Sequence, residues 1–240
     1  METTKLIGVG HGIRFINVSD DMLCAKPGGY GKVYSLDKDT CAKVYYVKFP
    51  VKAKKDTKEV LKKIKNLNID GMYNIYDFLY SRKNLEFKGY TMEKVDGLRL
   101  EEMPTKLAFE ILEMPTARAV NNVIKLELIG KKLSDNGIFI SDDFGSSIIC
   151  HDGTFTVTDA DSYLYRPERI QDVKKENNEL IRTFETAVPI RAAMKLRYQP
   201  NEIERIRENS KRIFFEKDVP LSERIYLLER EDTLVKSLLK

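Results

Sequence analysis

Apolar and polar positions near the start of the chain alternate in short runs separated by turn residues. From Met22 to Val47, three apolar runs are divided by a glycine-rich turn at 27–31 and a polar turn at 37–40. Short runs bounded by glycine, proline and aspartate are typical of antiparallel strands joined by hairpins. The pattern predicts three strands, at 22–26, 32–36 and 41–47.

The spacing of the apolar residues then changes to a helical one. Val60, Leu61, Ile64 and Leu67 lie on one face of a helix predicted at 56–67. Two strand-like runs follow, and from residue 105 to the end the pattern is mainly helical, clearest at 119–133. A single hairpin interrupts it, with its turn at His151, Asp152 and Gly153. The ranges of these features are 72–80 and 85–95 for the two strands and 144–161 for the hairpin.

This order gives a strand-rich first part with one helix, 1–95, and a mostly helical second part, 96–240. The fold class is therefore α+β. A chain of 240 residues suffices for one large domain or two small lobes, and 42% apolar residues can supply a core.

Composition narrows the class of protein. No stretch approaches the ~20 apolar residues of a membrane helix and no signal-peptide pattern is recognised, so we expect a soluble protein without membrane contact. The cysteines Cys24, Cys41 and Cys150 form no CxxC pair, which argues against a disulfide framework or structural zinc and fits a reducing cytoplasm. The net charge of +4 is spread along the chain, so nucleic-acid binding is not expected. Seven lysines at 52–65 indicate a solvated helix face or, alternatively, an acidic partner.

A glycine-rich segment at 26–33 is the first candidate for chemistry. Glycines let backbone N–H groups approach phosphate oxygens closely, and Lys43 follows on a predicted strand twelve residues after Gly31. A glycine-rich hairpin turn and an edge-strand lysine are the simpler interpretations of the two features. The glycine run at 8–12 has no lysine-bearing strand at a suitable distance. The candidate residues of the segment are Gly28, Gly29, Tyr30, Gly31 and Val33.

Carboxylates stand at three further places. Glu59 is the one acidic residue in the predicted helix after Asp56. Asp142 lies in a loop before the predicted hairpin, and Asp159 and Asp161 lie seventeen and nineteen residues later, at the hairpin's end. Hard cations such as Mg²⁺ prefer such oxygen ligands, while a polar hairpin end rich in aspartate is the simpler interpretation.

Taken together, the order and spacing of these motifs between residues 22 and 163 resemble the protein kinase-like superfamily. The resemblance implies a bilobal fold, with an antiparallel sheet and one helix in the first lobe and a reduced helical second lobe. It implies that ATP binds under the glycine-rich segment, that Lys43 holds its phosphates and that Glu59 holds Lys43. The segment 90–100 resembles the hinge, with Met92 as gatekeeper and the backbone from Glu93 to Val95 facing adenine.

The same resemblance assigns the second set of residues. Asp142 would position the acceptor hydroxyl, and Asp159 would bind Mg²⁺, with Asp161 and Ser147 as further oxygen ligands. The chain departs from the family at several positions. Ile140 replaces the catalytic-loop histidine, Phe144 the lysine and Ser147 the metal-binding asparagine, while Ala160 and Asp161 replace the phenylalanine and glycine after the metal-binding aspartate.

The function that follows is a cytoplasmic ATP- and Mg²⁺-dependent serine/threonine kinase that phosphorylates a protein hydroxyl. The short segment after Asp159 suits a constitutively active bacterial kinase or one delivered into a host cell as an effector. A small-molecule kinase of the aminoglycoside or choline type is an alternative, and so are a nucleotide-binding pseudokinase and a nucleotidyl transferase. The sequence does not identify the acceptor or the oligomeric state.

Overall fold

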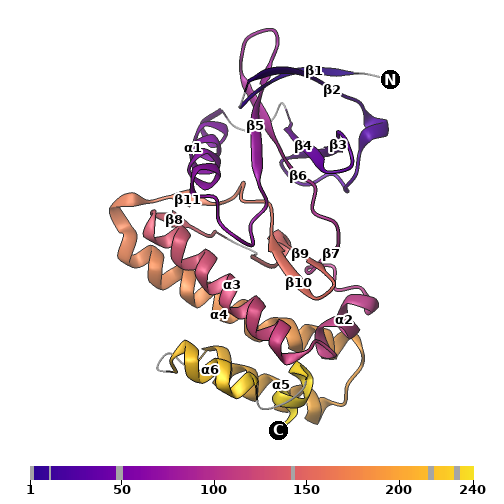
Figure 1. The fold of residues 1–240 in the computed structure, drawn as a ribbon, viewed down its shortest axis with the longest axis vertical. Helices are drawn as coiled ribbons and strands as arrows, with labels where there is room; N and C mark the ends of the chain where they lie inside the picture. Colours follow the sequence, from indigo (N-terminus) through magenta and orange to yellow (C-terminus); the bar gives the residue numbers. More distant parts are fainter. Residues whose placement is uncertain (1–2, 11, 47–50, 142–143, 216–218, 230–232) are drawn as a thin grey trace. The chain divides into compact units, whose positions relative to one another are not determined.

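The computed structural model describes residues 3–10, 12–46, 51–141, 144–215, 219–229 and 233–240, without the side chains of 51–55 and of residue 146. The chain forms two compact units. The first comprises Met1–Asn68 and Met72–Val95, and the second Ile69–Gly71 and Asp96–Lys240. The α+β class expected from the sequence is confirmed (Figure 1).

A six-stranded antiparallel sheet forms the first unit, in the order β2-β1-β5-β6-β4-β3 (Figure 1). One of its faces carries a compact apolar core, which includes Leu6 and Ile16 from the first two strands and Tyr34 and Ala42 from the last two. The strands are β1 (Thr4–Val9), β2 (Ile13–Val18), β3 (Gly31–Ser35), β4 (Thr40–Tyr45), β5 (Ile75–Ser81) and β6 (Phe87–Glu93).

The helix α1 (Val51–Leu67) begins five residues before the predicted start at Asp56. Val60, Leu61 and Ile64 are buried, as the spacing predicted. Lys58, which lies between buried positions, places its ammonium nitrogen 5.0 Å from the centre of the Tyr80 ring on β5. Part of the lysine-rich helix therefore packs on the sheet, with its long lysine stems covering aromatic rings.

The strand predicted at 22–26 is wrong. The chain forms a short 3₁₀ turn, η1 (Asp20–Met22), and then contacts β3 through one isolated bridge between Leu23 and Tyr34. The amide of Met22 donates to the carbonyl of Ser19 at 2.9 Å, so the local turn uses a group that a strand would need. Lys26 is followed by Pro27, which has no N–H to continue a ladder.

Helices dominate the second unit, together with two small sheets. The predicted hairpin is confirmed as β9 and β10, with His151 opposite Thr154, and β7 pairs with β9. A second pair joins β8 to β11. The strands are β7 (Leu98–Arg99), β8 (Ile138–Phe139), β9 (Ile148–His151), β10 (Thr154–Val157) and β11 (Leu164–Tyr165), with the 3₁₀ turn η2 (Phe144–Ser147) before β9.

The longest helix, α4, contacts α2, α3 and α5 and so forms the centre of this unit (Figure 1). Among the described residues, no helix combines the length and the apolar composition needed to cross a bilayer. The helices are α2 (Thr105–Leu112), α3 (Thr116–Asp135), α4 (Ile170–Lys195), α5 (Pro200–Ser210), α6 (Leu221–Leu228) and α7 (Leu234–Leu239), and a π-helical turn, η4 (Lys211–Phe215), follows α5.

Candidate functional site

Lys43 is buried inside the sheet of the first unit, with 7% of its surface exposed. It lies on β4 between Val33 of β3 and Tyr90 of β6. Next to it, Gly89 of β6 has a φ of +151°, and a Cβ atom there would overlap the carbonyl oxygen of Lys43. Gly89 thus lets the two strands meet closely beside the lysine. Because an ammonium group is costly to bury, a lysine at such a position is a candidate for function.

The glycines before β3 differ in what the fold requires of them. Gly31 is required, because a Cβ atom there would overlap the carbonyl oxygen of Val44. A Cβ atom at Gly28 would lie 3.8 Å from its nearest neighbour and one at Gly29 would have none within 4 Å, and neither glycine has a positive φ. The folded chain has room for side chains at both positions. Two consecutive glycines that packing does not require fit a segment whose backbone must approach a ligand.

The remaining residues of this segment are exposed or half-buried. Tyr30 is 52% exposed, and its carbonyl accepts a hydrogen bond of 2.9 Å from the amide of Tyr46. Val33 is half-buried on β3. Because the Tyr30 carbonyl is hydrogen-bonded to the residue that follows β4, the glycine-rich segment is held in place at one end.

Glu59 is exposed on α1, next to the buried Val60. Lys43 is buried by contrast, so the two charges have different environments in the first unit. Their pairing stays a prediction.

The predicted hinge, 90–100, begins inside β6, which ends at Glu93. The amide of Glu93 donates to the carbonyl of Asn74 at 2.8 Å, and the amide of Lys94 donates to the carbonyl of Asp39 at 2.9 Å. The Glu93 carboxylate accepts a further 2.8 Å bond from the Asn74 side chain. Both amides therefore stabilise the fold, while that of Val95 has no such bond in the described part of the chain. Met92 is half-buried.

In the second unit, Ser147 and Asp159 are joined directly. The Ser147 hydroxyl donates to the carbonyl of Asp159 at 3.1 Å, and the Ser147 carbonyl accepts bonds of 2.5 and 3.0 Å from the amide and the hydroxyl of Thr158. Asp159 has a φ of +48°, an uncommon backbone conformation for aspartate. Ser147 thus fixes the start of the acidic segment through both its hydroxyl and its carbonyl, a role that the sequence alone did not indicate.

The acidic segment is also fixed from its other end. Asp161 and Ala160 are buried, and the Ser141 hydroxyl donates to the carbonyl of Ser162. Burial raises the pKa of Tyr163, opposed by the Ser147 hydroxyl and reinforced by the Asp159 carboxylate, so this residue stays a neutral phenol. The structure therefore brings the segment before Asp142 together with the segment around Asp159 and Asp161. Asp142 itself lies outside the described residues.

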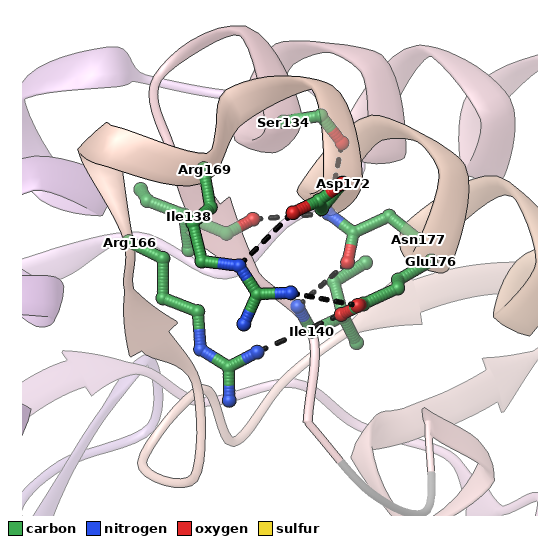
Figure 2. A network of polar contacts seen from close by, with 8 residues as sticks. All are labelled: Ser134, Ile138, Ile140, Arg166, Arg169, Asp172, Glu176 and Asn177. Carbon is green, nitrogen blue, oxygen red and sulfur yellow. Dashed lines mark hydrogen bonds and ion pairs between the residues drawn. The ribbon is translucent and has the colours of Figure 1, made fainter.

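A residue that the sequence did not single out, Asn177 of α4, holds the strand leading to Asp142. Its carbonyl oxygen accepts a 2.8 Å bond from the amide of Ile140, and its amide donates to the Ile138 carbonyl at 2.9 Å and to the Ser134 hydroxyl at 2.8 Å (Figure 2). Asn177 is fully buried, so these bonds are protected from water. An asparagine that stands beside a second one in a charged helix carries no sequence signal for such a role.

Two arginines flank this network on its exposed side. Arg166 lies 3.6 Å from the carboxylate of Glu176, and Arg169 lies 3.7 Å from it and 3.0 Å from that of Asp172 (Figure 2). These pairs lie on the surface and add little stability individually. They fix the turn that connects β11 to α4.

The predicted metal ligands include two aspartates of the segment after β10. The carboxylates of Asp159 and Asp161 are hard oxygen donors, and Mg²⁺ is commonly held by one or two carboxylates with substrate phosphates and water. Within the described ranges, no three His, Cys, Asp or Glu side chains cluster as a complete metal site. Asp159 and Asp161 could supply two of the oxygen ligands of such an ion.

The comparison with known proteins gives no match, either to a protein-family model or to a curated protein.

Proposed function

We propose that this chain is an ATP-dependent phosphotransferase of the protein kinase type, which transfers the γ-phosphate of Mg-ATP to a protein hydroxyl. The burial of Lys43 in the sheet carries the proposal, because an ammonium held there suits phosphate oxygens. Gly28 and Gly29 support it, since the fold leaves room for side chains at both. The bilobal kinase-like arrangement of the two units belongs to the same proposal.

The residues of each unit have distinct proposed roles. Lys43 would hold the nucleotide phosphates, with Glu59 as its carboxylate partner, and the Val95 amide would donate to adenine. Asp159 and Asp161 would hold Mg²⁺, which supplies positive charge to the phosphates. Asp142 would accept the proton of the acceptor hydroxyl. The oxygen of that hydroxyl bonds to the γ-phosphorus, while the bond between the γ-phosphorus and the leaving ADP oxygen breaks.

A nucleotide-binding protein without transfer activity is the second candidate. Ile140 and Phe144, which stand where the family has histidine and lysine, are completely or almost completely buried. The polar groups of the family's catalytic loop are thus replaced by apolar core. This observation favours a pseudokinase, whereas retention of Asp142 and Asp159 favours transfer.

Binding and transfer can be measured separately. Thermal unfolding with and without Mg-ATP reports binding, because a ligand of the folded state raises the Tm. We expect the Gly28→Val/Gly29→Val double variant to fold normally and to lose this shift, and Lys43→Met to weaken it. A double variant that binds Mg-ATP as tightly as the wild type would contradict the role of the glycines.

Transfer is tested with ATP labelled at the γ or the α phosphate, in the presence of protein acceptors. We expect γ-label on protein with the wild type, and none with Asp142→Asn or Asp159→Asn. Asp152→Asn is the matched control, because Asp152 has the same φ of +48° as Asp159 but is exposed, in the turn between β9 and β10. Transfer of α-label would indicate a nucleotidyl transferase, and binding without transfer would support the pseudokinase.

A further inference from the structure

A cavity of about 140 Å³ opens in the second unit beside the turn η2. Its walls come from three separate parts of the chain. Leu100 and Met103 contribute from the segment before α2, Phe144 and Gly145 from η2, and Leu180 and Phe184 from α4. The two residues from η2 follow Asp142 by two and three positions, so the cavity adjoins the loop that carries the proposed acceptor-positioning aspartate.

The walls are apolar and firmly packed. Phe144 is 1% exposed, and its ring meets that of Phe184 edge-on, with 5.3 Å between the ring centres. Leu180, Phe184 and Ala187 recur at helical spacing on α4, yet each stays only partly buried. An apolar stripe that remains half-exposed beside a loop suits an apolar group from another molecule.

One cation stands at the mouth of this cavity. Arg191 is exposed and lies one helical turn beyond Ala187. No carboxylate of the described residues lies within ion-pair distance of it, and no acidic side chain lines the cavity. The electrostatic complement of this mouth is therefore an anion, and a polycation such as an aminoglycoside would gain nothing here.

We propose that this cavity is an acceptor subsite that binds one bulky apolar side chain, leucine or phenylalanine, of the protein substrate, with an adjacent acidic residue paired to Arg191. The proposal rests on the phosphotransferase function and specifies its substrate class. The volume suits a single side chain, since an apolar cavity of about 150 Å³ accommodates one benzene ring. The proposal also explains why Phe144 stands where the kinase-like superfamily has a lysine, because the Phe144 side chain forms one wall of the cavity.

The experiment uses alanine-based peptides with one serine, in which a phenylalanine–glutamate pair is scanned along the sequence. Fluorescence anisotropy without nucleotide measures binding, and steady-state kinetics with Mg-ATP measure KM and kcat. We expect one spacing of the pair to bind best and to give the lowest KM. Replacing its phenylalanine by alanine should weaken binding about tenfold or more, because burial of such a side chain contributes about 1.5–3 kcal/mol.

Two substitutions then test the subsite itself. Ala187→Phe fills the cavity and should raise the peptide KM about tenfold with kcat unchanged, while Ala117→Phe, at an exposed alanine of α3, should leave it unchanged. Arg191→Glu should disfavour the glutamate peptide and favour one with lysine in its place. Lys195→Glu, an exposed lysine one turn further along α4, is the matched charge control.

The outcomes distinguish the two proposals. Equal binding of all peptides by the wild type, or unchanged KM values in Ala187→Phe and Arg191→Glu, would overturn the subsite even if phosphate transfer persists. Loss of Mg-ATP binding or of all transfer would overturn the kinase function, while anisotropy would still decide whether the cavity binds the apolar–acidic pair. A reversed charge preference in Arg191→Glu, absent from Lys195→Glu, would support the subsite.

Discussion

Two buried polar residues on the same helix, Asn177 and Glu185, differ in whether their side chains have hydrogen-bond partners. They stand eight positions apart on α4, so they lie on the same face, and each is at most 6% exposed. Every polar atom of the Asn177 side chain has a partner, in Ile140, Ile138 and Ser134. Burial alone therefore does not decide whether a polar group stabilises the fold, since its partners do.

The surroundings of Glu185 offer its carboxylate fewer polar partners. Neither carboxylate oxygen has a hydrogen bond within the described residues, and the nearest guanidinium nitrogen, on Arg224, lies 3.8 Å away. Arg224 bonds instead to Glu127. Burial raises the pKa of Glu185 well above its usual range, and Glu127 adds to this shift while Arg224 and Arg182 oppose it. Pro189 has no N–H to donate to the Glu185 carbonyl, so the helix is also weaker here.

The largest effect is expected from Asn177→Leu. It leaves the amide of Ile140 and the carbonyl of Ile138 without partners, so we expect the free energy of unfolding to fall by about 3 kcal/mol. Urea denaturation measures this change. Asn178→Leu is the matched control, because Asn178 is exposed on the same helix and should change little. Equal effects of the two substitutions would contradict the role assigned to Asn177.

A smaller loss of stability is expected when the arginine beside Glu185 is removed, and a second substitution, at Glu185 itself, should reverse it. Arg224→Met removes the guanidinium that bonds to Glu127 and lies beside Glu185, and we expect the free energy of unfolding to fall by about 2 kcal/mol, because Glu127 loses its ion-pair partner and the buried Glu185 loses the nearest cation that offsets its burial. Replacing Glu185 by leucine in that variant should restore most of the stability, since apolar side chains often replace buried ion pairs without cost. Denaturation midpoints of the single and double variants measure both effects. A double variant less stable than Arg224→Met would mean that the ion cluster itself stabilises the fold.

Much of the fold followed from local patterns. The hairpin at β9 and β10, the buried stripe of α1 and the α+β class were predicted correctly, because each depends on neighbouring residues. The hairpin of β1 and β2 was missed. In β2, the polar Arg14 shares the inward face with the buried Ile16 and Val18, and it reaches the buried Asp77, a contact 63 positions away in the chain. Such a distant partner leaves no local periodicity.

The candidate site was predictable in part for the same reason. Lys43 could be identified because an isolated charge in an apolar run is visible in the sequence, and its burial gives that charge physical meaning. Asn177 could not be identified, because its partners lie 37 to 43 positions away. The contrast between a required Gly31 and two glycines with free space around them likewise depends on strand β4, which no local pattern places.

A gain in stability is expected from Glu185→Gln. The raised pKa means that the folded chain keeps a proton which the unfolded chain releases near pH 4.3, so stability falls as pH rises above that value toward the folded pKa. The variant lacks this loss and should become progressively more stable than the wild type, by about 1 kcal/mol at neutral pH. Urea denaturation at several pH values measures the difference. A constant difference across this range would show that Glu185 is not protonated in the folded state.

The smallest change in stability is expected at two buried serines, which also differ in whether their hydroxyls have hydrogen-bond partners. The Ser134 hydroxyl donates to the Gly130 carbonyl at 2.6 Å and accepts from Asn177, whereas the buried Ser210 hydroxyl has no hydrogen bond within the described residues. Ser134→Ala should cost about 1 kcal/mol, while Ser210→Ala should be neutral or slightly stabilising, because it removes a polar group that gains nothing from burial. Thermal unfolding of the two variants provides the measurement. Equal losses would imply that the packing of the hydroxyl, and not its hydrogen bonds, decides its contribution.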